Sequence, residues 1–351
     1  MILSDIALLR NGKFIPESKR NGNINIYGST GIIGKTDEIL IDTDAVVIGR
    51  VGANCGVVQF AVGPSWITDN CVICLAKKSN LKYIYYVLQS KNLHELHSGS
   101  AQPLLTGKVL NNISVPEHSS DEQSHIVDIL GSIDDSVENN EKIIEALEEK
   151  MLLEYDHLIT STTLAESEMQ EIFDISIGKT PPRKESHWFT ENSEDVKWLS
   201  ISDMGKAKVF AFDSSEKITA EGIEKYNVKI APENTVLLSF KLTIGKVAIT
   251  GCEMATNEAI AHFVSDDENI VEYLYCYLKR YNFDMLGNTS SIATAVNSKT
   301  IKAMKFYYPD METLADFHRI AEPLIKKIKH LLITNAKLNE LKQLYLKKFF
   351  G

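Results

Sequence analysis

The sequence has no long hydrophobic run and few cysteines. No segment approaches the roughly 18 uninterrupted apolar residues of a membrane-spanning helix, and the opening stretch MILSDIALLRNGKF already contains Asp5 and Arg10. The five cysteines are an odd number without regular spacing, which is typical of a reducing compartment. We therefore expect a cytoplasmic protein with no membrane partner.

Motifs for metal and phosphate chemistry are also missing. None of the nine histidines belongs to an HExxH motif or a spaced cluster. Cys71 and Cys74 lie in the strand-like run CVICLA, where their odd separation points the two side chains to opposite faces. The segment GIIGKT, residues 31 to 36, imitates the end of a phosphate-binding loop, but Ser29 stands where that motif needs a glycine. The sequence predicts no bound metal and no cofactor.

Catalytic loops are equally hard to find. A base-modifying amino-methyltransferase needs an Asp/Asn/Ser-Pro-Pro-aromatic loop to hold a flipped base, and the string TPPR at 180–183 lacks the polar acceptor and the ring. A nuclease would need Asp310 to meet Glu340 and Lys342, but the last two lie inside a predicted helix. We therefore expect a protein without catalysis of its own.

The sequence does contain two long amphipathic helices. Residues 121–158 and 314–349 each carry apolar residues at the four-three spacing of a coiled-coil seam. The first seam consists of Ile126, Leu130, Ile133, Val137, Ile144, Leu147, Met151 and Tyr155, and the second of Phe317, Ala321, Leu324, Ile328, Leu331, Leu338, Leu341 and Tyr345. A helix of about 36 residues is roughly 54 Å long and needs a partner for its stripe. We expect the two helices to pair antiparallel.

Both predicted helices have a polar interruption and a similar lead-in. Asn140 fills a gap in the first seam and Asn335 the matching gap in the second, while Pro323 should kink the second helix or mark where its continuous part begins. Pro116 and His125 recur 193 residues later as Pro309 and His318. The chain is therefore predicted to be an internal duplication of block and helix, with a pseudo-twofold relation between its halves.

The charge is distributed unevenly over this plan. The whole chain has a net charge of −10, but residues 120–167 alone carry −11. The first block (1–119) has +2, the second (168–309) −4 and the end of the chain (310–351) +3. Because the acidity belongs mainly to the first long helix, a nucleic-acid partner for the blocks is not excluded.

Each block has the pattern of an α+β domain. In the first, residues 24–33, 44–51 and 66–75 resemble strands, residues 80–93 an amphipathic helix with Asn80 as N-cap, and a polar loop follows. The second block repeats this order with the strands TVLLSF, GKVAIT and ATNEAIAHFV, the helix NIVEYLYCYLKRYNF and the loop NTSSIATAVNSK. We expect four segments: domain 1–119, helix 120–166, domain 167–311 and helix 312–351.

These residues carry a family resemblance. GKTPPRKESHW, WLSISDM, ITAEGIEKYNVKIAPENTVLLSFKLTIGKVAIT and ATNEAIA resemble a target-recognition domain of the specificity subunit of Type I restriction-modification systems. INIYGSTGIIGKTDE, SGSAQPLLTGKVLNNISVP and EQSHIVDILGSIDDSVENNEKIIEALEEK are similar to the first such domain, its closing segment and the central spacer helix. The resemblance covers nearly the whole chain, and the distal helix departs from the spacer pattern at Pro323.

The resemblance implies a non-catalytic subunit that reads a bipartite sequence in double-stranded DNA, one domain for each half-site. It also implies that the long helices separate the domains and dock two modification (methyltransferase) subunits and the restriction (translocase/nuclease) subunits. The target sequence cannot be derived from the residues.

Candidate DNA contacts are polar or basic side chains on loops, since base edges and phosphates are read by such groups. In the two blocks in turn they are Tyr27, Ser29, Thr30, Arg50, Asn54, Gln102 and Lys108, then Lys179, Thr180, Arg183, Lys184, Lys241, Thr243, Lys246, Ser290, Ser291 and Lys299. A purely structural role stays open for several polar or aromatic residues: Asn54 between glycines can simply form a turn, and Trp188 and Trp198 fit a core better than base stacking. The alternative function is a non-DNA protein scaffold with duplicated domains, and a stand-alone modification enzyme is disfavoured by the missing loop.

Overall fold

The computed structural model describes residues 1–96, 104–241, 243–287 and 296–351. Within it the chain forms two compact units. The first unit contains Met1–Glu138 and Ala336–Gly351, and the second contains Asn139–Asn335. Each unit therefore combines one block with a part of both long helices. None of the described helices is long and apolar enough to cross a membrane.

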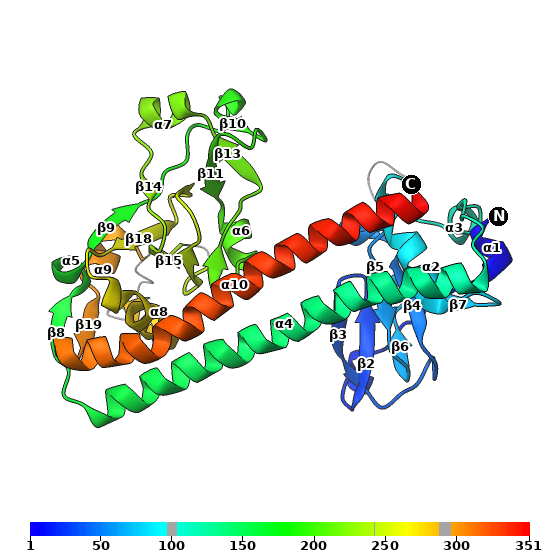
Figure 1. Cartoon of the computed structure of the whole chain (residues 1–351), viewed down its shortest axis with the longest axis horizontal. Coiled ribbons are helices and arrows are strands. Elements are labelled where there is room, and N and C mark those ends of the chain that lie inside the picture. Colours follow the sequence, from blue (N-terminus) through cyan, green and yellow to red (C-terminus); the bar gives the residue numbers. More distant parts are fainter. Residues whose placement is uncertain (97–103, 242, 288–295) are drawn as a thin grey trace. The chain divides into compact units, whose positions relative to one another are not determined.

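The block of the first unit is built on a four-stranded antiparallel sheet with the order β1-β7-β4-β5. A smaller sheet, β3-β2-β6, lies beside it and contains the parallel pair β2 and β6. The elements, most of them labelled in Figure 1, are α1 (Leu3–Ile6), β1 (Ala7–Asn11), β2 (Ile24–Gly28), β3 (Gly31–Thr36), β4 (Ala45–Gly49), η2 (Gly52–Asn54), β5 (Val58–Ala61), β6 (Ser65–Ile67), β7 (Cys71–Ala76), α2 (Leu81–Gln89) and α3 (Gly107–Asn111).

Local sequence explains several of these elements. Every residue of β4 is buried, as expected for a central strand covered on both faces. The predicted cap of α2 is confirmed, because the Asn80 side chain accepts hydrogen bonds from the amides of Lys82 and Tyr83. The predicted division of Cys71 and Cys74 is also confirmed, since the two side chains belong to different hydrophobic clusters. Burial raises the pKa of Cys74 to about 12, so this thiol stays protonated.

The block of the second unit has two five-stranded sheets, ordered β12-β16-β15-β18-β9 and β10-β13-β11-β17-β14. Strand β19 pairs separately with β8. The elements are β8 (Ala165–Glu168), α5 (Met169–Ile172), β9 (Asp174–Ile177), β10 (Phe189–Thr190), β11 (Val196–Leu199), α6 (Ile201–Lys206), β12 (Phe210–Ala211), β13 (Glu216–Ile218), α7 (Ala220–Tyr226), β14 (Ile230–Ala231), β15 (Val236–Ser239), β16 (Val247–Thr250), β17 (Met254–Thr256), β18 (Ile260–Val264), α8 (Val271–Arg280), α9 (Ser298–Lys302) and β19 (Lys305–Tyr308).

The predicted internal duplication is confirmed by the strand pairings. The run β9-β18-β15-β16 repeats β1-β7-β4-β5, and every neighbouring pair in both runs is antiparallel. The parallel pair β11 and β17 likewise repeats β2 and β6. Both blocks are thus mixed helix-and-strand domains of one design, and the α+β prediction is correct.

The two long helices are α4 (Ser120–Ser161) and α10 (Met311–Phe350). Within the second unit they run antiparallel, because Tyr155 stacks edge-on against Phe317 and the Asn140 amide donates to Asn335 Oδ1 at 2.8 Å. Within the first unit Asp134 pairs with Lys342 at 2.7 Å. The aligned asparagines satisfy each other, which explains why both seams contain one.

The helix α10 continues through Pro323 from Met311, so of the two roles expected for this proline it does not mark where the continuous part begins. Beyond Asn335 the buried stripe also differs from the predicted one: Lys342, Leu346 and Phe350 are buried, whereas Leu341 is 40% exposed. Burial there recurs every four residues instead of alternating four and three, because the helix packs against α2 as well as α4: Lys342 Nζ lies 5.4 Å from the Tyr86 ring centroid.

Candidate nucleic-acid interface

One edge of the second block collects many of the predicted residues. Lys179 and Thr180 follow the end of β9, and the amide of Lys179 donates to the Thr256 carbonyl at 2.9 Å. The loop from Lys241 to Lys246 leaves the adjoining end of β15, where Phe240 N donates to the Ala259 carbonyl. Two predicted segments, far apart in sequence, therefore end beside the turn between β17 and β18.

Asn257 and Glu258, which form that turn, were not predicted. The Asn257 amide donates to Thr180 Oγ1 at 3.3 Å, and the Thr180 hydroxyl donates to the Glu258 carboxylate. Amide and carboxylate side chains can read adenine and the cytosine amino group, so both residues join the candidate interface. The string TNEA between two strands was the available signal, but nothing local places it next to Thr180.

Arg183 is held in a fixed orientation. Its guanidinium lies 3.9 Å from the centroid of the Phe189 ring and 4.7 Å from that of Trp198, and Nη1 donates to Glu216 Oε1 at 2.7 Å. Half of the side chain stays exposed. Trp188 and Trp198 are buried, as expected of core residues, and Trp198 also forms the surface on which Arg183 stacks. An arginine ordered in this way loses less side-chain entropy on binding a base or phosphate.

The two basic residues of the loop after β15 have different surroundings. Lys241 is exposed and stacks over Phe240. Thr243, a third predicted residue of this loop, accepts a hydrogen bond from Ser239 Oγ at its carbonyl. Lys246 lines a hollow of about 430 Å³ together with the acidic Glu145 and Glu148 of α4, so it lies on the side of the block that faces this helix. The structure thus places Lys241, more than Lys246, among the residues at the edge.

The first block gathers its candidates at the equivalent end of its sheet. Ser29 and Thr30 form the turn between β2 and β3, and Arg50 directly follows β4. A Cβ on Gly49 would come within 3.2 Å of the Ser29 side chain and would overlap the Asn54 carbonyl, so these three segments touch. Tyr27 is 7% exposed and belongs to a hydrophobic cluster, which leaves it little surface for DNA.

Lys13 is a further residue that was not predicted. It follows β1 as Lys179 follows β9, its amide donates to Ile67 O at 2.9 Å, and its carbonyl accepts from Trp66 Nε1 at 2.9 Å. In the second block Trp198 Nε1 donates to the Lys179 carbonyl at 3.1 Å. The Gly-Lys pair after each first strand, GKF and GKT, was the signal that could have revealed both.

The other predicted residues lie apart from these edges or cannot be placed. Lys184 is exposed one residue after Arg183. Lys108 lies on α3 and Lys299 on α9, and both are exposed. Three candidates lie outside the described residues: Gln102, Ser290 and Ser291.

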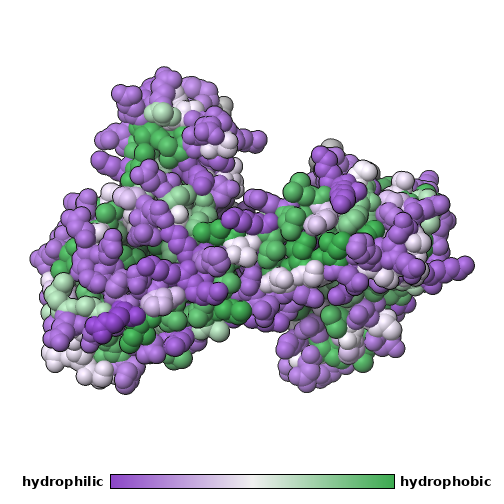
Figure 2. Space-filling model, viewed as in Figure 1, coloured by the Kyte–Doolittle hydropathy of each residue, from purple (hydrophilic) through white to green (hydrophobic). Residues whose placement is uncertain are grey.

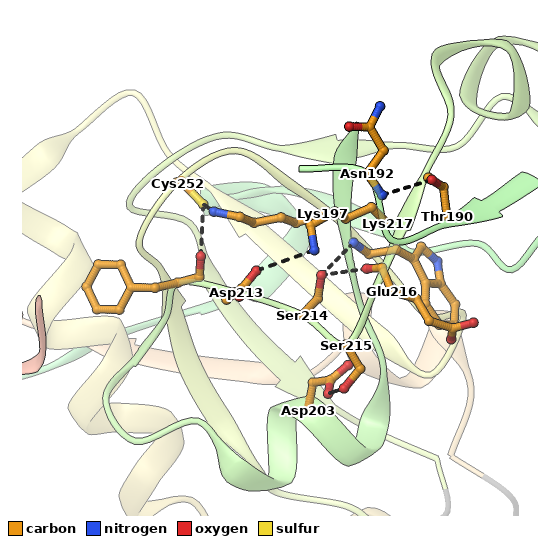
Figure 3. A network of polar contacts seen from close by, with 12 residues as sticks. Thr190, Asn192, Lys197, Asp203, Asp213, Ser214, Ser215, Glu216, Lys217 and Cys252 are labelled. Atoms are coloured by element: carbon orange, nitrogen blue, oxygen red, sulfur yellow. Dashed lines mark hydrogen bonds and ion pairs between the residues drawn. The ribbon is translucent and has the colours of Figure 1, made fainter. Parts of the chain in front are cut away.

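A further basic pair, Lys197 and Lys217, lies next to Glu216, the partner of Arg183 (Figure 3). Lys197 and Lys217 are directly opposite each other on β11 and β13, an arrangement in which like charges repel. Lys197 Nζ lies 3.4 Å from Cys252 Sγ, and Lys217 Nζ lies 4.0 Å from Asp213 Oδ1. Hydrophilic residues cover most of the surface visible around α7 and β10 in the same block (Figure 2). Lys217 is 14% exposed and faces Asp213, so this pair adds little free positive charge to the surface.

The segments that imitate catalytic motifs have structural roles. Residues 31–36 form strand β3, and the buried Thr36 hydroxyl donates to the Lys19 carbonyl at 2.7 Å. Asp310 caps the start of α10 by accepting from the Thr313 amide. His318 Nδ1 lies 2.9 Å from Glu272 Oε2, a contact between α10 and α8. No group of three or more His, Cys, Asp or Glu side chains in the described part of the chain could hold a metal ion.

The model of the Type I restriction modification DNA specificity domain matches residues 1–149 and 163–343, one match for each half of the chain. The chain belongs to this family. The crystal structure of a Type I restriction-modification S subunit from M. genitalium has the same fold, with a TM-score of 0.63 at 17% identity, and the alignment covers 100% of this chain and 95% of that one. The two matched segments correspond to the two duplicated halves.

Curated relatives are similar at moderate identity. The chain is 26% identical over 187 residues to the HindI specificity subunit of Haemophilus influenzae, which is 52% of this chain and 40% of that protein. A putative type I restriction enzyme specificity subunit of the same species is 24% identical over 343 residues, covering 92% of this chain and 86% of that one. The EcoprrI specificity subunit of Escherichia coli is 31% identical over 139 residues, 38% and 35% of the two chains. The match to HindI thus spans less than half of that relative.

Proposed function

We propose that this chain is the non-catalytic subunit that reads a bipartite DNA sequence for a Type I restriction-modification complex. Residues 1–119 and 167–311 are the two recognition domains, and residues 120–166 and 312–351 form the spacer that sets their separation. The observation that carries the proposal is the repeated strand order, in which polar side chains gather at the equivalent sheet edge of each block. Duplicated readers suit a target made of two half-sites.

The proposal assigns one half-site to each edge. Arg183, Lys179 and Asn257 serve the second half-site, and Arg50 and Ser29 the first. Arginine reads guanine by two parallel hydrogen bonds, which the stacked guanidinium of Arg183 can offer from its exposed side. The string TPPR at 180–183 lacks the polar acceptor and the ring of a base-modifying loop, which favours a reader over an enzyme.

The chain is proposed to work with partner subunits, which bring the methyl donor, the catalytic loop and the restriction activity. Its net charge of −10 disfavours tight binding of a polyanion by the chain alone. We expect weak DNA binding by the isolated chain and tight binding after two modification subunits dock on the long helices. Titration of DNA with and without those subunits tests this dependence, and equal affinity in both states contradicts it.

The central experiment is a domain exchange. The chain is co-expressed with its cognate modification subunits, and adenine methylation is mapped across a genome. Replacing residues 168–309 with the corresponding block of a relative should change one half of the methylated sequence and leave the other. A chimera altered in both halves contradicts one domain for each half-site, and the absence of any bipartite methylated sequence favours a protein scaffold.

The spacer role has its own test. Insertion of four residues into α4 lengthens the helix by about 6 Å, or one turn. The unspecified gap between the half-sites should lengthen while both half-sites stay the same. An altered half-site with an unaltered gap would count against the spacer.

A further inference from the structure

His262 lies at the centre of the second block, behind the candidate DNA-contacting edge. It is on β18, between β9 and β15, and is fully buried. A buried histidine needs partners for both ring nitrogens. Nδ1 lies 3.1 Å from the Ser176 hydroxyl, and Nε2 lies 2.6 Å from the Thr256 hydroxyl.

Two acceptors lie within reach of the single Thr256 hydroxyl proton: the Asn257 carbonyl at 3.3 Å and His262 Nε2 at 2.6 Å. In the tautomer with the proton on Nε2, His262 donates to Thr256, Thr256 donates to the Asn257 carbonyl, and Nδ1 accepts from Ser176. Burial lowers the pKa of His262 to about 4, so the ring is neutral at physiological pH and has one proton to place.

The chain of bonds ends at the residues that face outward. The Asn257 amide N–H is held by the Leu199 carbonyl, its Oδ1 accepts from Ala259 N at 2.8 Å, and its Nδ2 donates to Thr180. The adjoining strand leaves no slack, because a Cβ on the buried Gly178 would overlap Thr256 Oγ1 and the Asn257 carbonyl. The Thr256 hydroxyl and the Asn257 carbonyl therefore pack closely against Gly178 and against each other.

We propose that His262 is a positioning residue for sequence reading, which orients Thr256 through Nε2–H and thereby sets the aim of Asn257, Thr180 and Glu258 at the second half-site. This inference rests on the proposed function. The fold alone does not require the histidine, because the first block has Ile73 at the matching place. Ile73 is the third residue of β7, opposite Val47 of β4, as His262 is the third residue of β18, opposite Leu237 of β15.

Two substitutions separate the ring nitrogens. His262→Gln places an amide nitrogen near the position of Nε2 and keeps a donor for Thr256, whereas His262→Asn places a polar atom near Nδ1 and keeps only the Ser176 contact. Both are neutral and polar, so burial of charge does not differ between them. Thr256→Val removes the accepting hydroxyl with little change of shape, and Ser176→Ala removes the other end of the chain of bonds.

The test uses the complex of this protein with its modification subunits. DNA affinity is measured with duplexes that carry the target sequence mapped for the wild-type protein and with duplexes that have a single base change in either half-site. We expect the unmodified protein to discriminate about five- to 100-fold against a changed base in either half. His262→Gln and Ser176→Ala should keep this discrimination within about threefold, which is less than the usual cost of one mismatched base pair. His262→Asn and Thr256→Val should lose most of the discrimination, and only in the second half-site. Thermal unfolding of each variant confirms that measurements are made on folded protein.

The outcomes are distinct. If Gln and Asn variants discriminate alike, or if both half-sites change together, the positioning role is wrong and His262 only packs the core. If the unmodified protein methylates no bipartite sequence, the proposed function fails, and this inference fails with it. A general loss of packing does not explain discrimination that is kept in His262→Gln and lost in His262→Asn.

Discussion

The two blocks build the same turn from different chemistry. In both, a glycine follows the first strand and packs against the residues that lead into the neighbouring strand, β7 or β18, and a lysine comes next: Gly12 and Lys13 in one, Gly178 and Lys179 in the other. Behind that turn the first block places the buried Ile67 and Ile73, whereas the second places Thr256 and His262. The shared backbone is therefore compatible with an apolar or a polar interior.

This difference indicates what each interior contributes. Apolar side chains stabilise a turn by burial but do not determine where a hydroxyl or carbonyl points. A saturated line of hydrogen bonds does determine it, at the risk that one missing partner leaves buried polar groups unpaired. The second block thus has the more closely defined edge, and it should also be the more sensitive to substitution and to acid.

The largest difference should appear where each block closes onto its long helix. Phe306 is fully buried and its ring contacts Phe173, Tyr273 and Tyr277, whereas Ile113, at the equivalent distance before Pro116, is 7% exposed. Phe306→Ala should lower the free energy of unfolding of its block by about 3–5 kcal/mol, and Ile113→Ala by roughly 2 kcal/mol. Hydrogen exchange of β18 and β7 assigns each loss to its block. Equal losses would mean that the aromatic cluster adds nothing beyond ordinary burial.

Acid should affect the second block selectively. The pKa of His262 is lowered from 6.5 to about 4 by burial, so between these pH values the unfolded chain binds a proton that the folded chain does not. The stabilisation is complete above pH 6.5 and falls by about 3 kcal/mol as the pH decreases to 4. His262→Leu should remove this part of the pH dependence, as measured by hydrogen exchange of β18. A slope that persists in the variant would assign the effect to other groups.

Much of this organisation was predictable because it depends on local pattern. The two long helices, the Asn80 cap, the paired Asn140 and Asn335 and the repeat of the blocks all follow from spacing along the chain. The shifted stripe of α10 was not, since Lys342 is buried by residues of α2 and α4. Nor was the turn at Asn257, because a strand register decides which residues meet Thr180.

The next largest effect should come from the arginine at each edge, Arg183 in the second block and Arg50 in the first. Arg183→Ala should cost about 1–3 kcal/mol of discrimination at the second half-site, and Arg50→Ala a similar amount at the first, if each makes a bidentate base contact. Arg183→Lys should restore little, because an ammonium cannot reproduce the planar stack on Phe189 and the fork to Glu216. Affinity for duplexes with single base changes measures each effect. A loss at the opposite half-site would contradict the division between the blocks.

The smallest effect should come from the two lysines that the blocks share. Lys13 and Lys179 are both exposed, and each is anchored by its backbone to a turn and to a tryptophan, so their ammonium groups start from equivalent positions. If both contact phosphate, Lys13→Ala and Lys179→Ala should each weaken binding to all sequences alike and reduce the slope of log affinity against log salt by about 0.9. Lys78→Ala, a change of an exposed lysine beyond the far end of β7, is the matched control and should leave the slope unchanged. Salt titrations of the complex with specific and unrelated duplexes measure this directly. A different result is that Lys179→Ala changes base discrimination while Lys13→Ala changes only the salt slope. Lys179 would then contact a base where Lys13 contacts a phosphate, because the polar interior of the second block holds its edge in a different position. The two edges would differ in function as well as in chemistry.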